Sequence, residues 1–233
     1  MKKLNAFRAR LTPAQVAEGI NAATSNAKRL AGDAATLLAA NRFPSAASLA
    51  ILSIEEAGKV SILREIALAS TEQEASESWK NYRSHTRKNF AWILPDLAAR
   101  GARRLDDLKP LVQPDAEHPY LLDQVKQLGF YTDCLGKAHW SKPIDVISKE
   151  LAASLVTTAN TFAHGGECTA REIELWIEHL KPVWSRDSGW MKQGIINWYA
   201  AMQREGLKPE GENVMQQFIH RRIAAGSPEP STE

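Results

Sequence analysis

Three charged side chains interrupt an apolar part of the chain and are the first residues that could do chemistry. Between Arg42 and Arg64 only Glu55, Glu56 and Lys59 carry charge. If this segment is a helix, either carboxylate lies within reach of the ammonium group, at a spacing of three or four residues. The leftover negative charge needs a partner, because an unpaired buried charge is strongly destabilising. Another segment must therefore supply a cation or a hydrogen-bond donor.

A donor-rich segment over residues 80–89 is the expected source of that partner, and it contains Arg83, His85 and Lys88. We expect this segment to lie on a third helix that packs antiparallel to the second. Glu56 shares a helix face with Leu49, Leu52, Val60 and Leu63, so we expect Glu56 to point into the core. Glu55 is then the more exposed of the two glutamates.

Glu56, Lys59, Arg83, His85 and Lys88 together could cleave RNA without a metal ion. His85 can act as acid or base near neutral pH. Arg83 or Lys88 can stabilise the negative charge that develops on the phosphoryl group, while Glu56 orients His85 or Lys59. The alternative is a buried Glu–Lys–His network that only fixes the register of the helices.

Metal and cysteine chemistry find less support in the sequence. The chain has no Glu-x-x-His motif of the kind that helical di-iron sites use, so we expect no metal and no cofactor. Cys134 and Cys168 are expected to be small buried or half-buried side chains. A nucleophilic cysteine paired with His139 or His164 is the alternative, although we expect His164 to interact with a helix end.

The composition excludes several classes of protein. The 233 residues carry 29 basic and 27 acidic side chains, a net charge of +2, which gives no strong overall field. Two cysteines cannot form a disulfide scaffold. Arg8 and Arg10 interrupt any signal peptide, and no uncharged segment is long enough to cross a membrane. We therefore expect a cytoplasmic protein without a membrane partner.

Two further groups of residues could bind nucleic acid but have a simpler interpretation. Trp79, Trp92 and four tryptophans of the C-terminal helices could stack on bases, yet their helical spacing favours the core. Arg100, Arg103, Arg104 and Lys109 are the nearest approach to a basic patch. We expect them to lie in a solvated loop.

Helix signals dominate the chain. Thr12, Thr71 and Thr169 each precede a Gln or Glu by three residues, which predicts capping boxes at three helix starts. Apolar and small residues at steps of three and four follow the first start, and the second helix is apolar almost all round, so it should be central. The predicted helices are 13–40, 44–69, 72–94, 121–128, 143–162, 171–184, 189–204 and 212–224, with a short extended piece at 129–133.

The sequence therefore predicts an all-α protein. We expect an N-terminal helical core over residues 11–108, and a C-terminal helical region over 109–225 packed on it. Residues 226–233 contain two prolines and no large apolar side chain, and are expected to be disordered.

Several motifs together resemble the AbiV family of bacterial abortive-infection proteins, which belongs to the HEPN helical superfamily. The resemblance covers about residues 11–185. It rests on Glu55-Glu56-Ala57-Gly58-Lys59 with Ala46-Ala47-Ser48-Leu49-Ala50 before it and His85 and Lys88 after it, and on Gly129-Phe130-Tyr131-Thr132-Asp133 followed by Trp140-Ser141-Lys142-Pro143. It implies a HEPN-like helical bundle with an additional C-terminal helical region, a homodimer, and a role in phage defence.

The resemblance also implies metal-independent RNA cleavage, which is the activity of many superfamily members. Those members usually carry an Arg followed after four to six residues by a His, and this chain departs from that pattern: Arg83 precedes His85 by two positions. The first functional hypothesis is a phage-defence effector that acts on RNA or on the translation machinery, as a metal-independent ribonuclease. The alternative is a non-catalytic, dimeric helical binding module that senses or sequesters a phage or host protein.

Overall fold

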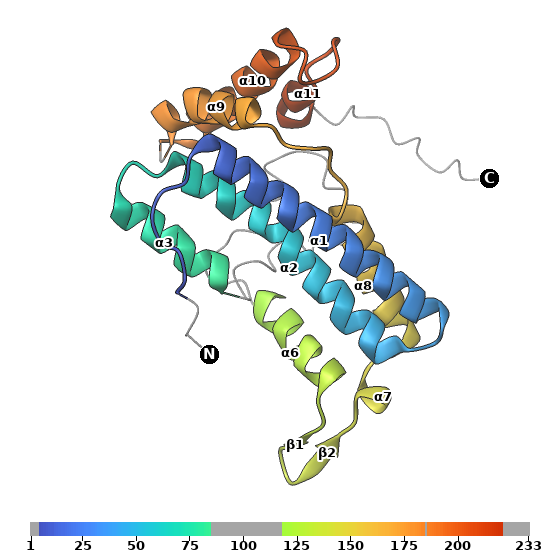
Figure 1. The fold of residues 1–233 in the computed structure, drawn as a ribbon. Coiled ribbons are helices and arrows are strands. Elements are labelled where there is room, and N and C mark those ends of the chain that lie inside the picture. The colour runs from blue at the N-terminus through green and yellow to red at the C-terminus, as the bar shows by residue number, and fades with distance from the viewer. Residues whose placement is uncertain (1–4, 85–117, 185, 221–233) are drawn as a thin grey trace, which may run out of the picture.

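A computed structural model of the chain describes residues 5–84, 118–184 and 186–220 (Figure 1). Within these ranges the secondary structure is helical apart from one short hairpin, which confirms the all-α class. The boundary expected at 108/109, the predicted helical residues 85–94, Trp92, the arginine-rich loop and the 226–233 tail lie outside the described residues. None of the described helices has the length and apolarity needed to cross a membrane.

The described elements are mostly helices. In chain order they are α1 Pro13–Ala39, α2 Phe43–Leu68, α3 Glu72–Arg83, α6 His118–Phe130, β1 Asp133–Leu135, β2 His139–Ser141, α7 Pro143–Val146, α8 Lys149–Phe162, α9 Ala170–Leu180, η2 Lys181–Val183, α10 Ser188–Arg204 and α11 Val214–His220. The long α1 and α2 form a central antiparallel pair (Figure 1). Helices α3, α6 and α8 pack along α2, α9–α11 lie at one end, and the hairpin with α7 lies at the other.

The start of α1 and its packing face agree with the sequence. The Thr12 hydroxyl accepts from the backbone N–H of Gln15, whose side chain accepts from the N–H of Thr12, as a capping box requires. A turn at Asn41, with φ of 59°, returns the chain into α2, and asparagine tolerates this left-handed conformation. The buried residues of α1 are Val16, Ala17, Ile20, Ala23, Ala27, Leu30, Ala31 and Ala34.

Helix α2 is buried on several sides, as its nearly uniform apolarity predicted. Alanines 46, 47 and 50 in its first half have no accessible surface. Their small size lets α6 and α8 approach α2 closely. The contact between Gly129 of α6 and the first turns of α2 leaves no room for a side chain. A Cβ at Gly129 would collide with the Ser48 hydroxyl and lie 3.2 Å from the Pro44 carbonyl oxygen. Two hydrophobic clusters follow one another along the α1–α2 pair, and a third joins α9 to α10.

Three predicted boundaries were wrong. Helix α3 ends at Arg83, because Ser84 adopts an extended conformation (φ −79°, ψ 125°). The predicted helix over 143–162 is split into α7 and α8, and Ser148 caps the start of α8 by accepting from the N–H of Leu151. The predicted extended piece is a two-stranded antiparallel hairpin that pairs Cys134 with Trp140.

Candidate functional site

The structure reverses the roles expected for the two adjacent glutamates of α2. Glu55 is the buried one, with 2% of its surface accessible, whereas Glu56 is only half-buried. The reason is a cation supplied by α6. Lys126 of α6 places its Nζ 2.6 Å from Glu55 Oε1 and 2.9 Å from Asp123 Oδ1.

This group of three charges is held together inside the protein. Burial by itself lowers the pKa of Lys126. The hydrogen bonds and negative charges of Asp123 and Glu55 outweigh that effect, so the pKa of Lys126 lies above its ordinary value. The ammonium group therefore stays charged and ties α6 to the middle of α2. Removing Glu55 would leave the ammonium group with Asp123 alone, whose side chain is 34% exposed, whereas removing Lys126 would leave the buried Glu55 without this cation.

Sequence reasoning missed Lys126 because nothing local connects it to Glu55. The two residues are 71 positions apart, and a lysine on an amphipathic helix is usually exposed. The signal that was present is a glutamate inside an apolar helix, which predicted a cation from another element. That expectation was correct in kind, and among the described residues the cation comes from α6.

Glu56 and Lys59 form the pair that their spacing predicted. Lys59 Nζ lies 2.5 Å from Glu56 Oε1, and the two side chains are 18% and 19% exposed. The ammonium group also lies 5.2 Å from the centroid of the Tyr82 ring, within range of a cation–π interaction. The antiparallel packing of α2 and α3 thus brings the last turn of α3 beside this pair, as expected.

Arg83, in the same turn of α3, contacts a different part of the protein. Its guanidinium donates to the carbonyl oxygens of Trp79 and Phe7 and lies 5.1 Å from the Trp79 ring centroid. Trp79 Nε1 in turn donates to the carbonyl oxygen of Ala9, at 2.9 Å. These contacts fasten the segment before α1 to α3, which explains why an arginine sits at this position.

The remaining predicted site residues, His85 and Lys88, lie outside the described residues. Of the five candidates, the structure therefore brings Glu56 and Lys59 together and directs Arg83 to the N-terminal segment. Across residues 5–84, 118–184 and 186–220, no group of three or more His, Cys, Asp or Glu side chains is placed to share a metal ion.

The two cysteines differ in exposure, and the expectation of a buried or half-buried side chain was wrong for Cys134. Cys134 is exposed on the hairpin and Cys168 is buried. Burial, with a smaller contribution from the negative charge of Glu172, raises the pKa of the Cys168 thiol to about 11. His164 Nδ1 donates to the Asn160 carbonyl oxygen in the last turn of α8, which agrees with the expected role at a helix end.

The tryptophans divide between the core and the surface. Trp79 and Trp198 are buried and Trp176 is half-buried, as predicted, and the rings of Trp176 and Trp198 meet edge to face with centroids 5.0 Å apart. The core prediction was wrong for Trp184 and Trp190, which are exposed.

Comparison with known proteins gives one match. The family model of AbiV, a family of HEPN proteins, matches residues 15–164. This range begins in the first turn of α1 and ends just after α8, so it contains the α1–α2 pair, the buried charges and the Glu56–Lys59 pair. No curated protein and no solved structure gives a significant match to the chain.

The first prediction concerns the two glutamates. Glu55→Ala should lower the free energy of unfolding by about 2–3 kcal/mol, because the buried Lys126 ammonium group loses one charged acceptor and keeps only the partly exposed Asp123. Glu56→Ala should cost about 1 kcal/mol or less, because its pair with Lys59 is partly open to solvent. Urea unfolding followed by circular dichroism measures both values.

A double variant separates lost charge from lost packing. Glu55→Met combined with Lys126→Met should recover most of the stability that either change loses alone, since an apolar pair can replace a buried ion pair. Equal losses for Glu55→Ala and Glu56→Ala would contradict the assignment of Glu55 to the core.

The second prediction concerns the cysteines. At pH 8 iodoacetamide should modify Cys134 at least ~10²-fold faster than Cys168, because only the thiolate reacts and the buried thiol is almost fully protonated. Raising the pH toward 11 should speed the modification of Cys168. Peptide mass spectrometry gives both rates, and protein unfolded in urea serves as the control. Similar rates in the folded protein would show that Cys168 is an accessible nucleophile.

Proposed function

The chain belongs to the AbiV family of HEPN proteins, and on this basis we propose that it acts on RNA or the translation machinery as a metal-independent ribonuclease. Abortive-infection phage defence is the function that this family indicates, and the family model covers 150 of the 233 residues, positions 15–164. The finer assignment, RNA cleavage, is our proposal. The observation that carries it is the partly accessible Glu56–Lys59 pair beside Tyr82.

The proposed chemistry divides the work among three kinds of group. Cleavage without a metal needs a base for the 2′-hydroxyl, an acid for the leaving oxygen, and positive charge on the phosphoryl group. Lys59 is a partly desolvated cation held in place by Glu56 and the Tyr82 ring, as a phosphate-binding group should be. His85 supplies the acid–base function near neutral pH. Lys88 supplies further positive charge, since the Arg83 guanidinium is engaged by Phe7 and Trp79.

A homodimer forms part of the same proposal. Cleavage with both an acid and a base needs two proton-transfer groups, and the proposed set contains a single histidine per chain. Two chains related by a twofold axis would place two copies of the set across one groove. We therefore propose a symmetric homodimer, which light scattering would report as twice the mass of one chain.

The third prediction tests His85 as the acid–base group. His85→Asn keeps a polar side chain but cannot transfer protons near pH 7, so cleavage of total cellular RNA in EDTA should fall by ~10²-fold or more. His220→Asn, which changes an exposed histidine at the end of α11, is the matched control and should leave cleavage unchanged. Circular dichroism and light scattering should show the same fold and mass for both variants. A folded His85→Asn protein that cleaves RNA and protects cells like the wild type would refute this role.

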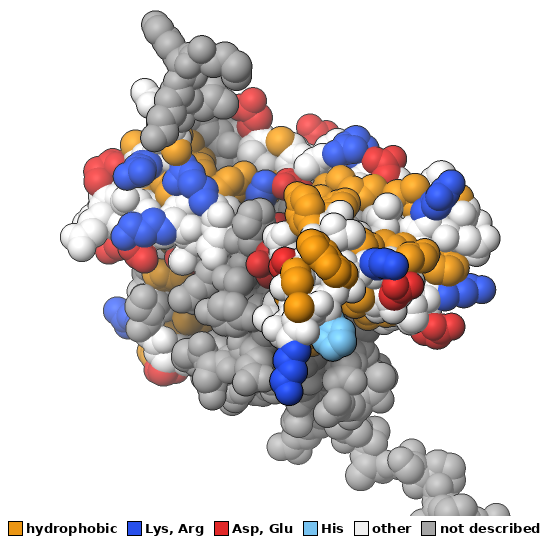
Figure 2. Space-filling view, turned by 90° about the horizontal axis from the view of Figure 1, so that it is seen from below, with side chains coloured by type: hydrophobic (Ala, Val, Ile, Leu, Met, Phe, Trp, Pro, Cys, Tyr) orange, Lys and Arg blue, Asp and Glu red, His pale blue; other side chains and the backbone are white. Residues whose placement is uncertain are grey.

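A second candidate function is supported by an exposed apolar surface at the hairpin end of the molecule. We call it the hairpin patch, and Figure 2 shows apolar side chains gathered on this face. It consists of Phe130, Tyr131, Trp140, Ile144 and Val146, all exposed, with Trp140 at 71%. Exposed apolar side chains that lie together are typical of protein-binding sites. The patch therefore favours the alternative of a dimeric, non-catalytic module that senses or sequesters a phage or host protein.

The fourth prediction separates the two candidate functions. Trp140→Ser with Ile144→Ser removes the most exposed apolar side chains of the hairpin patch. If the protein is a binding module, phage protection should fall at least ~10-fold in plating efficiency while the fold and the dimer mass are unchanged. Trp190→Ser, at an exposed tryptophan of α10 at the opposite end of the molecule, is the control (Figure 1). Full protection by the double variant would exclude the hairpin patch as the partner surface.

A further inference from the structure

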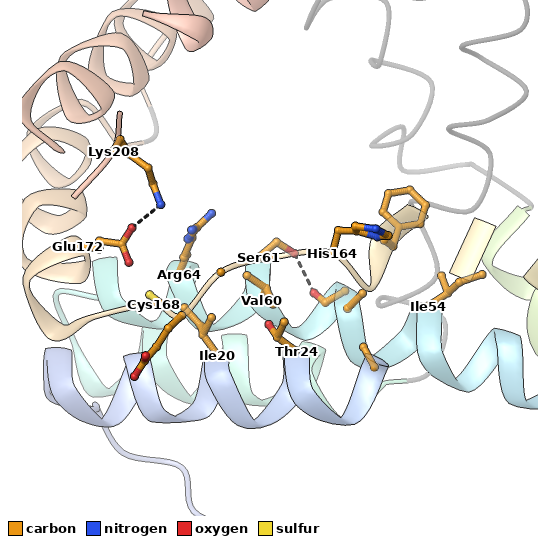
Figure 3. A pocket seen from close by; sticks show the side chains of 17 residues that line it. Ile20, Thr24, Ile54, Val60, Ser61, Arg64, His164, Cys168, Glu172 and Lys208 are labelled. Carbon is orange, nitrogen blue, oxygen red and sulfur yellow. Dashed lines mark hydrogen bonds and ion pairs between the residues drawn. The ribbon is translucent and has the colours of Figure 1, made fainter. Parts of the chain in front are cut away.

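A cavity of about 480 Å³ lies between α1, α2 and the loop that leads from α8 to α9 (Figure 3). Apolar side chains of α1, α2 and the end of α8 line part of it: Ile20, Ala27, Ile54, Ala57, Val60 and Phe162. The polar side chains that line it include Arg64, Lys208, His164 and Ser61. A cavity of this size, with an apolar wall and a few polar groups, is typical of a site for a small organic ligand.

Arg64 is the side chain in the cavity that most needs a partner. It rises from α2 into the cavity, between the Glu172–Lys208 pair and Ser61 (Figure 3). The rings of Trp176 and Trp198 lie 5.5 and 5.2 Å from its guanidinium and hold the group in place. Its Nε is buried and has no hydrogen-bond partner in the part of the chain that the structure describes. Buried donors of this kind are rare in folded proteins and call for an explanation.

The nearby carboxylate does not meet this need. Glu172 Oε1 lies 2.8 Å from Lys208 Nζ, and Glu172 Oε2 accepts from the backbone N–H of Thr169 as part of the capping box of α9. Burial lowers the pKa of Arg64, while the charges of Cys168 and Glu172 act in the opposite direction. The guanidinium remains charged, because an arginine does not lose its proton in proteins. The cavity therefore contains a half-buried cation with one buried N–H donor, at Nε, that has no hydrogen-bond partner in the described part of the chain.

An oxyanion is the group that would use this donor. A guanidinium forms paired, charge-assisted hydrogen bonds with phosphate or carboxylate oxygens, and buried donors gain the most from them. Lys208 adds further donors on the cavity wall. Glu172 is neutralised by Lys208, and the second acidic side chain that lines the cavity, Glu167, is exposed to solvent. The Lys208 ammonium group has three N–H donors, so it can donate to a ligand while it stays paired with Glu172. A phosphate group has enough oxygens to accept from both Arg64 and Lys208, and it carries more charge than a carboxylate.

We propose that this cavity binds a small phosphorylated molecule of mononucleotide size, with its phosphate on Arg64 and Lys208 and its apolar or planar body along Ile20, Ile54 and Val60. The site does not depend on the ribonuclease proposal, because neither Glu56 nor Lys59 lines the cavity. It would give the protein a way to respond to a small metabolite.

Isothermal titration of the full chain with AMP, adenosine and inorganic phosphate tests the proposal. AMP should bind, and adenosine and inorganic phosphate should each bind at least ~10-fold more weakly, because each lacks one half of the ligand. Arg64→Met keeps an apolar side chain between the two tryptophans but removes the charge, so AMP should bind at least ~10-fold more weakly, as loss of a hydrogen bond to a charged group predicts. Arg171→Met is the matched control, since Arg171 is an exposed arginine paired with Glu174 and Glu205 outside the cavity. It should bind AMP like the wild type.

Ser61→Phe provides a second variant in case Arg64→Met fails to fold. Ser61 is exposed and lines the cavity, so a phenyl ring there should fill ligand space without touching the core. AMP should bind this variant at least ~10-fold more weakly. The proposal is overturned if the wild-type protein binds neither AMP nor phosphate at millimolar concentration, or if folded Arg64→Met or Ser61→Phe binds AMP unchanged. If inorganic phosphate binds as tightly as AMP, the proposal that the ligand is of mononucleotide size is overturned.

Discussion

The burial of α2 on several sides is the constraint on which the rest of the structure depends. The polar side chains on the buried faces of such a helix need partners inside the protein, since water is excluded there. Ser53 donates to the Ala27 carbonyl oxygen at 2.7 Å, and Glu55 receives the ammonium group of Lys126. The second of these contacts fixes how α6 lies along α2. The hairpin that follows α6 is therefore held in place indirectly by one buried ion pair.

Three features with different chemistry lie at different places around α2. Glu56 and Lys59 face the last turn of α3, where the Tyr82 ring lies against the ammonium group. Arg64, two turns from Glu56, points into the cavity that α1 and the α8–α9 loop complete. The hairpin patch lies beyond α6, at the far end of the molecule (Figure 1). One apolar helix thus separates the Glu56–Lys59 pair, the cavity at Arg64 and the hairpin patch, so each can be altered without the others.

The arrangement also shows why an apolar helix contains isolated charges at all. A charge that only kept the protein soluble would lie on an exposed face, where it costs nothing to solvate. Glu55 instead makes a specific, directional contact with Lys126 of α6. An apolar side chain at this position would pack against α6 with less directional preference. Arg64 has aromatic neighbours on α9 and α10 that position it, yet its Nε has no hydrogen-bond partner in the described structure. Glu55 and Arg64 differ in this respect. Glu55 has a partner within the chain, whereas the Arg64 side chain has a cavity beside it that could hold a ligand.

The sequence by itself determined the features whose causes lie within a few residues of one another. The caps at Thr12 and Thr169, the packing face of α1, the apolar α2 and the Glu56–Lys59 pair all follow from contacts three or four positions apart, and the AbiV resemblance rests on such local motifs. Only the tertiary structure decided which glutamate is buried, because the answer depends on Lys126, 71 positions away. It also decided that Arg83 fastens the N-terminal segment and that Arg64 faces a cavity. A helical pattern shows which residues share a face, but the burial of a charge is set by which distant segment covers that face.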